Sequence, residues 1–279
     1  MATTAKPLIL GAVAYDPKVV TIWEGFVEFF AARGLAFDFV LYANYERQVE
    51  AHLRGDIDVA WNSPLAWIES ERAAPGRCHA IAMRDSDRDL TSVILAKAGG
   101  AVHSLADLRG KRVAVGAHDS PQATLIPLEA IAEAGLAPGR DVEVLYHDVL
   151  VGKHGDHIGG ERDAVRALVN GRADAACVID GNRMAFAREG LFATGALAVV
   201  HQTAPYDHCN FTVIGDVTPA HAQFRELLLA MSYDDPKVRP LLDLEGLKRW
   251  LDGRTTGYAQ LARAVDRFGA IEAWLARVR

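Results

Sequence analysis

Short apolar runs alternate with amphipathic segments along the first quarter of the chain. The apolar runs predict strands, and apolar residues at intervals of three or four predict helices, as at Val20, Trp23, Val27 and Phe30. The predicted strands are 8–14, 37–42 and 58–61, and the predicted helices are 19–32, 45–53 and 64–72. Because strands and helices alternate strictly, we expect parallel sheets with helices on both faces.

The pattern starts again near residue 93. The predicted strands are then 93–98, 112–116, 142–146, 173–178, 196–201 and 211–214. A turn or short helix is predicted at 105–110, a helix at 121–134, and another that contains 164–170. The segment 220–279 is mostly helical in pattern, with breaks near Pro236, Pro240 and Gly253.

Two segments echo each other. Residues 53–60 (LRGDIDVA) and 169–176 (VNGRADAA) each combine a helix end, a glycine suited to a left-handed cap, and a strand that begins near an aspartate. We therefore predict an α/β protein of two doubly wound lobes joined by crossover strands near 91–97 and 196–213. Lobe 1 would be residues 1–92 with 205–279, and lobe 2 residues 93–204. Ligands of open parallel sheets bind beyond the carboxyl ends of the strands, so we expect a ligand cleft between the lobes.

Charge and composition exclude several classes of partner. The 279 residues carry 30 Lys and Arg against 36 Asp and Glu, which argues against a general attraction for nucleic acid or anionic lipid. No apolar run reaches the ~18 residues of a spanning helix. The three scattered cysteines contain no CxxC pair, so we expect no disulfide framework and no thiolate zinc cage. We expect a monomer that needs no cofactor.

The first residues of the chain are compatible with two cellular locations of the protein. The first residues lead directly into the predicted strand 8–14 and lack a basic-then-apolar secretion signal. The protein is expected to be cytoplasmic if Met1 is the native start, and periplasmic if a signal peptide has been removed.

Two strand-to-helix junctions predict polar helix entrances. Ser63 is placed to cap a helix that has Pro64 in its first turn, and Ser120 or Asp119 is placed to cap another before Pro121. Helix N-termini bind anions through free N–H groups and the helix dipole. Ser63 and Ser120 thus either cap their helices only or also bind the acceptor-rich end of a ligand.

Three stretches resemble the phosphonate-type substrate-binding proteins of ABC importers. Residues 55–66 (GDIDVAWNSPLA) are similar to that family's G-x-x-D-x-A-W-x-x-P-x-A, 104–116 (SLADLRGKRVAVG) to its S-L-x-D-L-x-G-K-x-V-A-x-G, and 170–175 (NGRADA) to its N-G-x-x-D-A. The resemblance runs from residue 8 to residue 214. It implies a type II periplasmic-binding-protein fold and no catalysis. It also implies a small polar or anionic ligand (phosphonate-like, carboxylate or zwitterion) that is delivered to an ABC permease.

The resemblance and the residues themselves together give a set of candidate ligand-binding residues. The family's anion loop falls on 119–123, where Ser120 matches but Pro121, Gln122 and Ala123 replace the usual Thr, Ser and Gly. The Gln122 amide could donate to a carboxylate, a carbonyl or a phosphoryl group. The predicted ligand-binding set is Tyr15, Tyr42, Trp61, Asn62, Ser63, Ser120, Gln122, His157 and Asp207. Its aromatic members suit either a cationic group or ordinary packing, and Asp207 suits an amino group on the ligand.

Two polar clusters keep an alternative open. Residues 153–157 (KHGDH) look like an insertion relative to the family. Its histidines, His154 and His157, are weak candidates for metal ligation with Asp156, for hydrogen bonding to the ligand, or for a solvated edge. Neighbours in a strand point to opposite faces, so we expect His208 and Cys209 to be poor partners. The alternative function is a cytoplasmic enzyme on the same fold that uses this loop and the Asp207-His208-Cys209 cluster.

Overall fold

The computed structural model describes residues 6–156 and 158–278. The chain forms two compact units. Unit 1 contains the residues up to Arg88, Asp207–Gly257 and the residues from Ile271 onward, and unit 2 contains Asp89–Tyr206 and Tyr258–Ala270. Residues 258–270 thus pack with unit 2, whereas the sequence analysis placed the whole of 205–279 in the first lobe.

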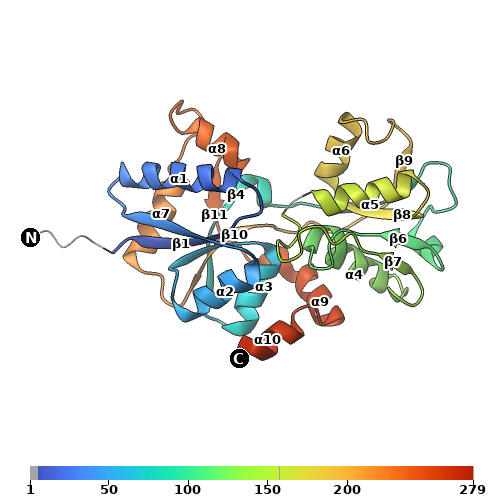
Figure 1. Ribbon diagram of the computed structural model, residues 1–279, viewed down its shortest axis with the longest axis horizontal. Helices are drawn as coiled ribbons and strands as arrows, with labels where there is room; N and C mark the ends of the chain where they lie inside the picture. Colours follow the sequence, from blue (N-terminus) through green and yellow to red (C-terminus); the bar gives the residue numbers. More distant parts are fainter. Residues whose placement is uncertain (1–5, 157, 279) are drawn as a thin grey trace, which may run out of the picture. The chain divides into compact units, whose positions relative to one another are not determined.

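A six-stranded mixed sheet forms the centre of unit 1 (Figure 1). Its order is β11 (Trp250–Asp252), β4 (Cys78–Arg84), β10 (Asn210–Ile214), β3 (Val59–Asn62), β1 (Leu8–Val13) and β2 (Phe37–Tyr42). Strand β1 is parallel to β2 and β3. Strand β10 is antiparallel to β3 and β4, and β11 is antiparallel to β4.

Helices cover both faces of this sheet. One face packs against α1 (Lys18–Ala31), α7 (Pro219–Leu229) and α8 (Arg239–Glu245), and the other against α2 (Tyr45–Arg54), α3 (Pro64–Ala73) and α10 (Glu272–Val278). Alternation along β1 explains the two layers, because Leu10 packs with Phe26 and Phe224 whereas Val13 packs with Trp274 on the opposite side.

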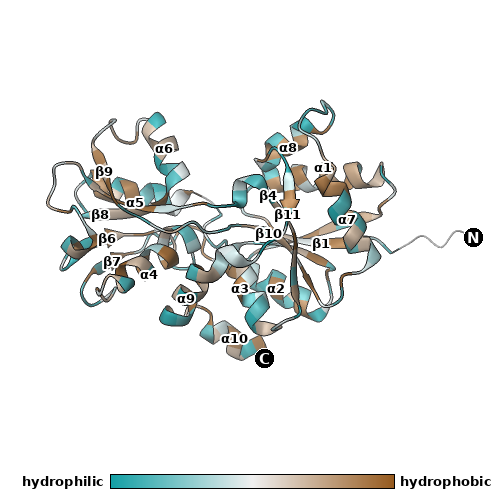
Figure 2. Ribbon diagram, turned by 180° about the vertical axis from the view of Figure 1, so that it is seen from behind, coloured by the Kyte–Doolittle hydropathy of each residue, from teal (hydrophilic) through white to brown (hydrophobic). Residues whose placement is uncertain are grey.

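Unit 2 has a five-stranded sheet in the order β7 (Glu143–Leu145), β6 (Arg112–Ala114), β8 (Ala175–Ile179), β5 (Ser92–Lys97) and β9 (Leu197–Gln202). Ile94 faces α4 (Ile126–Glu133) and α9 (Ala259–Phe268), and Leu95 faces α5 (Gly159–Val169) and α6 (Asp180–Arg188). Figure 2 shows the strands largely brown and the helices part brown and part teal, as expected for helices with one buried face. Short helical turns are η1 (Asp85–Asp87), η2 (Leu105–Leu108), η3 (Pro121–Leu125) and η4 (Thr256–Tyr258).

The sheets differ from the parallel arrangement that the sequence predicted. Strand β6 is parallel to β7 and β8, but β5 is antiparallel to β8 and β9. Strand–helix alternation predicts parallel order only where a helix follows each strand. Among the described residues, only the short turn η1 lies between β4 and β5, and no helix lies between β9 and β10. The sequence analysis missed β4, β11 and α6. Pro240 lies in the first turn of α8, so it begins this helix rather than breaking one.

The two echoed segments form the same local structure. The glycine in each has a positive φ, 77° and 74°. Asp58 accepts a hydrogen bond from the main-chain nitrogen of Ile9 at 2.8 Å, and Asp174 accepts one from that of Arg112 at 2.9 Å. The main-chain nitrogens of the two aspartates return bonds of 2.8 Å to the carbonyl oxygens of Ile9 and Arg112. Each aspartate therefore fixes the start of the neighbouring parallel strand within its unit.

Candidate functional site

The predicted helix entrance of unit 1 is present. The Ser63 hydroxyl accepts a hydrogen bond from the main-chain nitrogen of Ala66 at 3.1 Å and so caps α3. The preceding residue, Asn62, is buried and accepts from the Gln48 amide at 2.8 Å while donating to the Thr212 hydroxyl at 2.9 Å. Asn62 thus links β3, α2 and β10, and no sequence pattern marks Gln48 as its partner.

The predicted aromatic ligand-binding residues all contact the apolar cores of unit 1. Trp61 is only 5% exposed, its ring centroid is 4.6 Å from that of Phe211, and the Arg84 guanidinium lies 5.1 Å from its ring. Tyr15 packs half-buried against the same core. Tyr42 packs against the smaller core on the other face, where burial raises the pKa of its phenol. The sequence analysis left two roles open for these aromatic side chains, binding of a cationic group and ordinary packing. Within unit 1 all three pack against apolar cores.

Asp207 has a partner within the chain. Its carboxylate pairs with both ends of the Arg254 guanidinium, with N–O distances of 2.6 and 2.5 Å, and its side chain is fully buried. A Cβ atom added to Gly257 would lie 2.2 Å from this carboxyl group, so a glycine is required there. The structure therefore gives Asp207 a guanidinium where the sequence predicted an amino group of the ligand.

His208 and Cys209 are in contact, and the expectation that they point apart is wrong. The Nδ1 atom of His208 lies 3.1 Å from the Cys209 sulfur. Both residues precede β10, so the alternation of side chains along a strand does not apply to them. Asp87 lies 3.6 Å from the same Nδ1 atom. A nucleophile–base–acid relay needs its two partners on opposite ring nitrogens, so this cluster does not have that geometry.

The helix entrance of unit 2 is covered by the predicted insertion. Ser120 caps the helical segment by accepting from the main-chain nitrogen of Ala123 at 3.2 Å. The Gln122 amide donates to the carbonyl oxygen of Gly155 at 2.7 Å. A Cβ atom on Gly155 would lie 2.4 Å from the Ser120 hydroxyl oxygen, so the loop packs directly on the entrance. Just before the loop, the main-chain nitrogen of Gly152 donates to the Asp119 carboxylate at 2.5 Å, which is a second contact with this entrance.

Glu161, which the sequence analysis did not single out, adds a buried carboxyl group to this entrance. It is 3% exposed and accepts from the main-chain nitrogen of Ile179 and the Asn182 amide, both at 3.0 Å. Burial raises its pKa to about 7, although the amides of Asn182 and Gln122 oppose the shift. The only sequence signal is a glutamate in the first turn of a predicted helix, which normally indicates an exposed residue.

Three acceptor oxygens at or beside this entrance have no hydrogen-bond partner among the described residues. They are Oδ1 of Asp119, Oε1 of Gln122 and Oε1 of Glu161. Buried acceptors without donors are costly, so they favour a ligand that supplies donors.

Of the two loop histidines, only His154 lies among the described residues of unit 2. His157 lies outside the described residues. His154 has a backbone φ of 50°, which is uncommon for a residue other than glycine. The proposals of metal ligation and ligand contact for these histidines therefore remain predictions.

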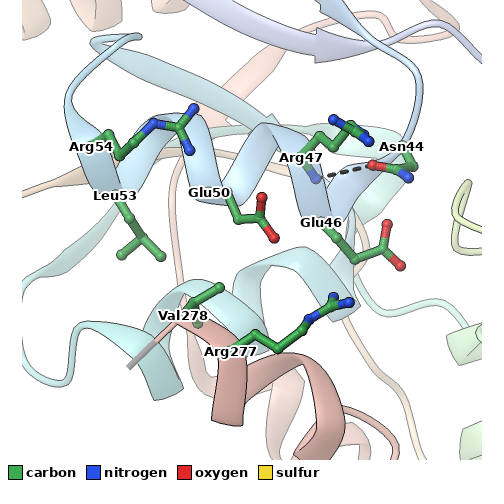
Figure 3. A pocket seen from close by; sticks show the side chains of 8 residues that line it. All are labelled: Asn44, Glu46, Arg47, Glu50, Leu53, Arg54, Arg277 and Val278. Carbon is green, nitrogen blue, oxygen red and sulfur yellow. Dashed lines mark hydrogen bonds between the residues drawn. The ribbon is translucent and has the colours of Figure 1, made fainter.

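A groove in unit 1 lies between α2 and the end of α10 (Figure 3). It is lined by Asn44, Glu46, Arg47, Glu50, Leu53, Arg54, Arg277 and Val278. Acidic and basic side chains are mixed along it, and it includes none of the predicted ligand-binding residues.

Comparisons with known proteins agree with the sequence motifs. A family model described as "ABC transporter, phosphonate, periplasmic substrate-binding protein" matches residues 12–258. The structure is similar to that of PhnD1 from Prochlorococcus marinus in complex with methylphosphonate, with 18% identity, a TM-score of 0.70, and coverage of 95% of this chain and 99% of that one.

Two further solved structures share the fold. A binding-protein component of an ABC phosphonate transporter from Pseudomonas aeruginosa is 12% identical, with a TM-score of 0.63 and coverage of 98% of this chain and 97% of that one. A Xanthomonas citri protein bound to ATP is 18% identical, with a TM-score of 0.69 and coverage of 99% and 98%. Within the described ranges, every helix is too short or too polar to cross a membrane.

Proposed function

This chain belongs to the family of periplasmic substrate-binding proteins of phosphonate ABC transporters, and we propose that its own solute carries a primary ammonium group that binds at the helix entrance of unit 2. The family has a type II periplasmic-binding-protein fold and binds small solutes for transport. It is not a family of enzymes, so the enzyme alternative finds no support.

The single observation that carries the proposal is the surplus of acceptors at this entrance. The Gln122 amide is used by the Gly155 carbonyl oxygen, and the Thr124 hydroxyl donates to the carbonyl oxygen of Ala117 at 2.7 Å. The remaining oxygens of Asp119 and Gln122 accept only, and that of Glu161 accepts when its carboxyl group is ionised. An ammonium group has three donors and no acceptor, so it matches this set.

Charge supports the same choice. A dianionic group placed alone at this entrance would meet the Asp119 carboxylate and, at neutral pH, a partly ionised Glu161. An ammonium group would instead favour the ionised form of Glu161. Together with the phosphonate solutes that the family description names, this favours a small zwitterion over a simple alkylphosphonate.

Calorimetry with two solutes that differ only in the amine tests the proposal. We expect 2-aminoethylphosphonate to bind more tightly than ethylphosphonate by roughly tenfold or more, since a hydrogen bond to a charged group contributes about 1.5–3 kcal/mol. Glu161→Gln should narrow this difference, whereas Glu143→Gln, a change at an exposed residue of the same unit, should preserve it. Equal affinities for the two solutes in the parent protein would contradict the proposal.

The finer assignments of partner and location belong to the same proposal. We infer that the protein acts in the periplasm as a monomer and delivers its solute to the permease of an ABC importer. Light scattering on the purified protein should give the mass of one chain, 30.2 kDa. Cell fractionation should recover the protein with the periplasmic contents.

A further inference from the structure

A cluster of three potential metal ligands lies in unit 1, among residues that the proposed solute site does not use. A carboxylate oxygen of Asp87, Nδ1 of His208 and the sulfur of Cys209 all lie within 4.8 Å of one another. The sulfur is 3.1 Å and the nearest Asp87 oxygen 3.6 Å from Nδ1. All three residues are buried, and Cys209 is 2% exposed.

The backbone holds these three ligand atoms in place. The main-chain nitrogen of His208 donates to the carbonyl oxygen of Asp87 at 2.7 Å, which fixes the segment before β10 against η1. Both neighbours face the same ring nitrogen, so the three atoms surround one point. In a tetrahedral zinc site, bonds of about 2.0–2.3 Å place ligand atoms roughly 3.3–3.6 Å apart. The observed separations of Nδ1 from its two neighbours require only small adjustments.

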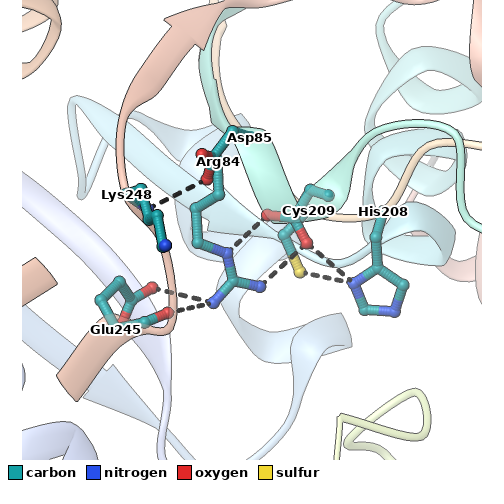
Figure 4. Close-up of polar contacts among 7 residues, drawn as sticks. Arg84, Asp85, His208, Cys209, Glu245 and Lys248 are labelled. Atoms are coloured by element: carbon teal, nitrogen blue, oxygen red, sulfur yellow. Dashed lines mark hydrogen bonds and ion pairs between the residues drawn. The ribbon is translucent and has the colours of Figure 1, made fainter. Parts of the chain in front are cut away.

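The charges around this point favour a cation. The Arg84 guanidinium pairs with the Asp87 carboxylate at 2.6 and 2.9 Å and with Glu245 at 3.3 Å, so two carboxylates share one guanidinium. Figure 4 shows the Arg84 guanidinium between Glu245 and Cys209, with the His208 ring beyond the sulfur. Nearby, the Asp85 carboxylate accepts a hydrogen bond from the main-chain nitrogen of Lys248 at 3.2 Å.

We propose that Asp87, His208 and Cys209 bind a borderline-soft divalent cation of the Zn²⁺ class. Thiolate and imidazole ligands select Zn²⁺ and Cd²⁺ over Mg²⁺ and Ca²⁺. Binding forms bonds from the metal to sulfur, nitrogen and oxygen, and the thiol proton is released to water. The thiolate then adds a third negative charge beside the single guanidinium, and the divalent cation neutralises the cluster. Arg84 does not block the site, because an ionised carboxylate has about four acceptor positions.

Titration of the reduced, chelator-treated protein with Cd²⁺ tests the site directly. We expect one equivalent to produce the ultraviolet thiolate-to-metal charge-transfer band, and Zn²⁺ to abolish the band by competition and to raise the melting temperature. Cys209→Ser and His208→Gln should lose the band and the melting shift. The matched control is Cys78→Ser, which removes a thiol on β4 outside the cluster and should keep both.

A second variant covers the case in which Cys209→Ser does not fold. In Cys78→Ser/Cys177→Ala the only remaining thiol is that of Cys209, and the band must persist at one equivalent. Absence of the band in the parent protein, or its loss in this double variant while the variant stays folded, overturns the proposal. The measurement uses no solute, so its failure is distinguishable from failure of the proposed transport function.

Discussion

The side-chain amide of Gln122 donates a 2.7 Å hydrogen bond to the carbonyl oxygen of Gly155, and this bond joins the loop 153–157 to the helix entrance that the loop covers. The sequence analysis expected the Gln122 amide to donate to a ligand, but in the structure it donates to the chain's own backbone. The entrance is therefore left with acceptor oxygens, which is the basis of the ligand chemistry proposed above.

Gly155→Ala should destabilise the protein and weaken solute binding. The new Cβ would lie 2.4 Å from the Ser120 hydroxyl oxygen and 2.7 Å from the Gln122 amide, and the residue already has a φ of 73°. Gly139→Ala is the matched control, because its φ of 82° is equally unfavourable but nothing lies within 4 Å of the added atom. We expect urea unfolding to show an additional loss of about 1–3 kcal/mol for Gly155→Ala. Equal losses for the two variants would show that the loop is not tightly packed.

Asp207→Asn should be strongly destabilising. The change leaves the Arg254 guanidinium without its charged partner. Because this guanidinium is 32% exposed and water screens part of its charge, the loss should be about 1.5–3 kcal/mol. Asp252→Asn removes the partner of Arg225, but Asp252 is 65% exposed, so its loss should stay below about 1 kcal/mol. Unfolding free energies measured in denaturant give both values. Similar small effects would mean that the Asp207 pair contributes no more than a surface pair.

Glu161→Gln should change how stability depends on pH. The folded-state pKa of Glu161 is raised from 4.5 to about 7, so the unfolded chain loses this proton at a lower pH than the folded chain does. The stability of the folded state therefore falls as the pH rises from the lower value to the higher one. The neutral glutamine removes this loss while it can keep the bonds from Ile179 and Asn182. We compare the unfolding free energy of the variant with that of the parent at two pH values. The difference, variant minus parent, should be about 2 kcal/mol larger at about pH 8.5 than at about pH 5.5. A constant difference would contradict the raised pKa.

His52 should make the protein sensitive to acid. Burial is the main cause that lowers its pKa to about 4, and the nearby His221 lowers it further. The unfolded chain binds a proton near pH 6.5, whereas the folded chain resists it, so stability falls as pH drops below that value. The loss between about pH 7 and pH 5 is about 2 kcal/mol. His52→Leu should flatten this part of the profile, and the exposed His79→Gln should leave it unchanged.

Local patterns predicted the features that depend on local structure. The Ser-Pro pairs at 63–64 and 120–121 correctly marked two helix starts, because capping involves only the residues that follow. The echoed segments correctly marked two equivalent strand starts. The partners of Asp58 and Asp174 lie 49 and 62 residues away, so their shared role in fixing a neighbouring strand required the structure.

Local sequence patterns could not predict which residues are buried by segments that lie far away in the sequence. Glu161 reads as an exposed first-turn glutamate, and it is buried because β8 and α6 supply its hydrogen-bond donors. Trp61 stands at a strand end, but Phe211 from a strand 150 residues later encloses it in the core. The contact of His208 with Cys209 depends on where β10 begins, and helix and strand boundaries are the least certain part of any prediction from sequence.

The interleaved composition of the two units has a consequence for the order in which a newly made chain can fold. Unit 2 takes α9 from residues 258–270, where Arg267 pairs with Glu129, and unit 1 takes β10 and β11 from residues 207–257. Neither unit can complete its core while the ribosome is still adding the last quarter of the chain. Contacts between residues so distant in sequence slow folding and expose apolar strand edges during synthesis. The segments that complete both sheets and both cores therefore become available only late in translation.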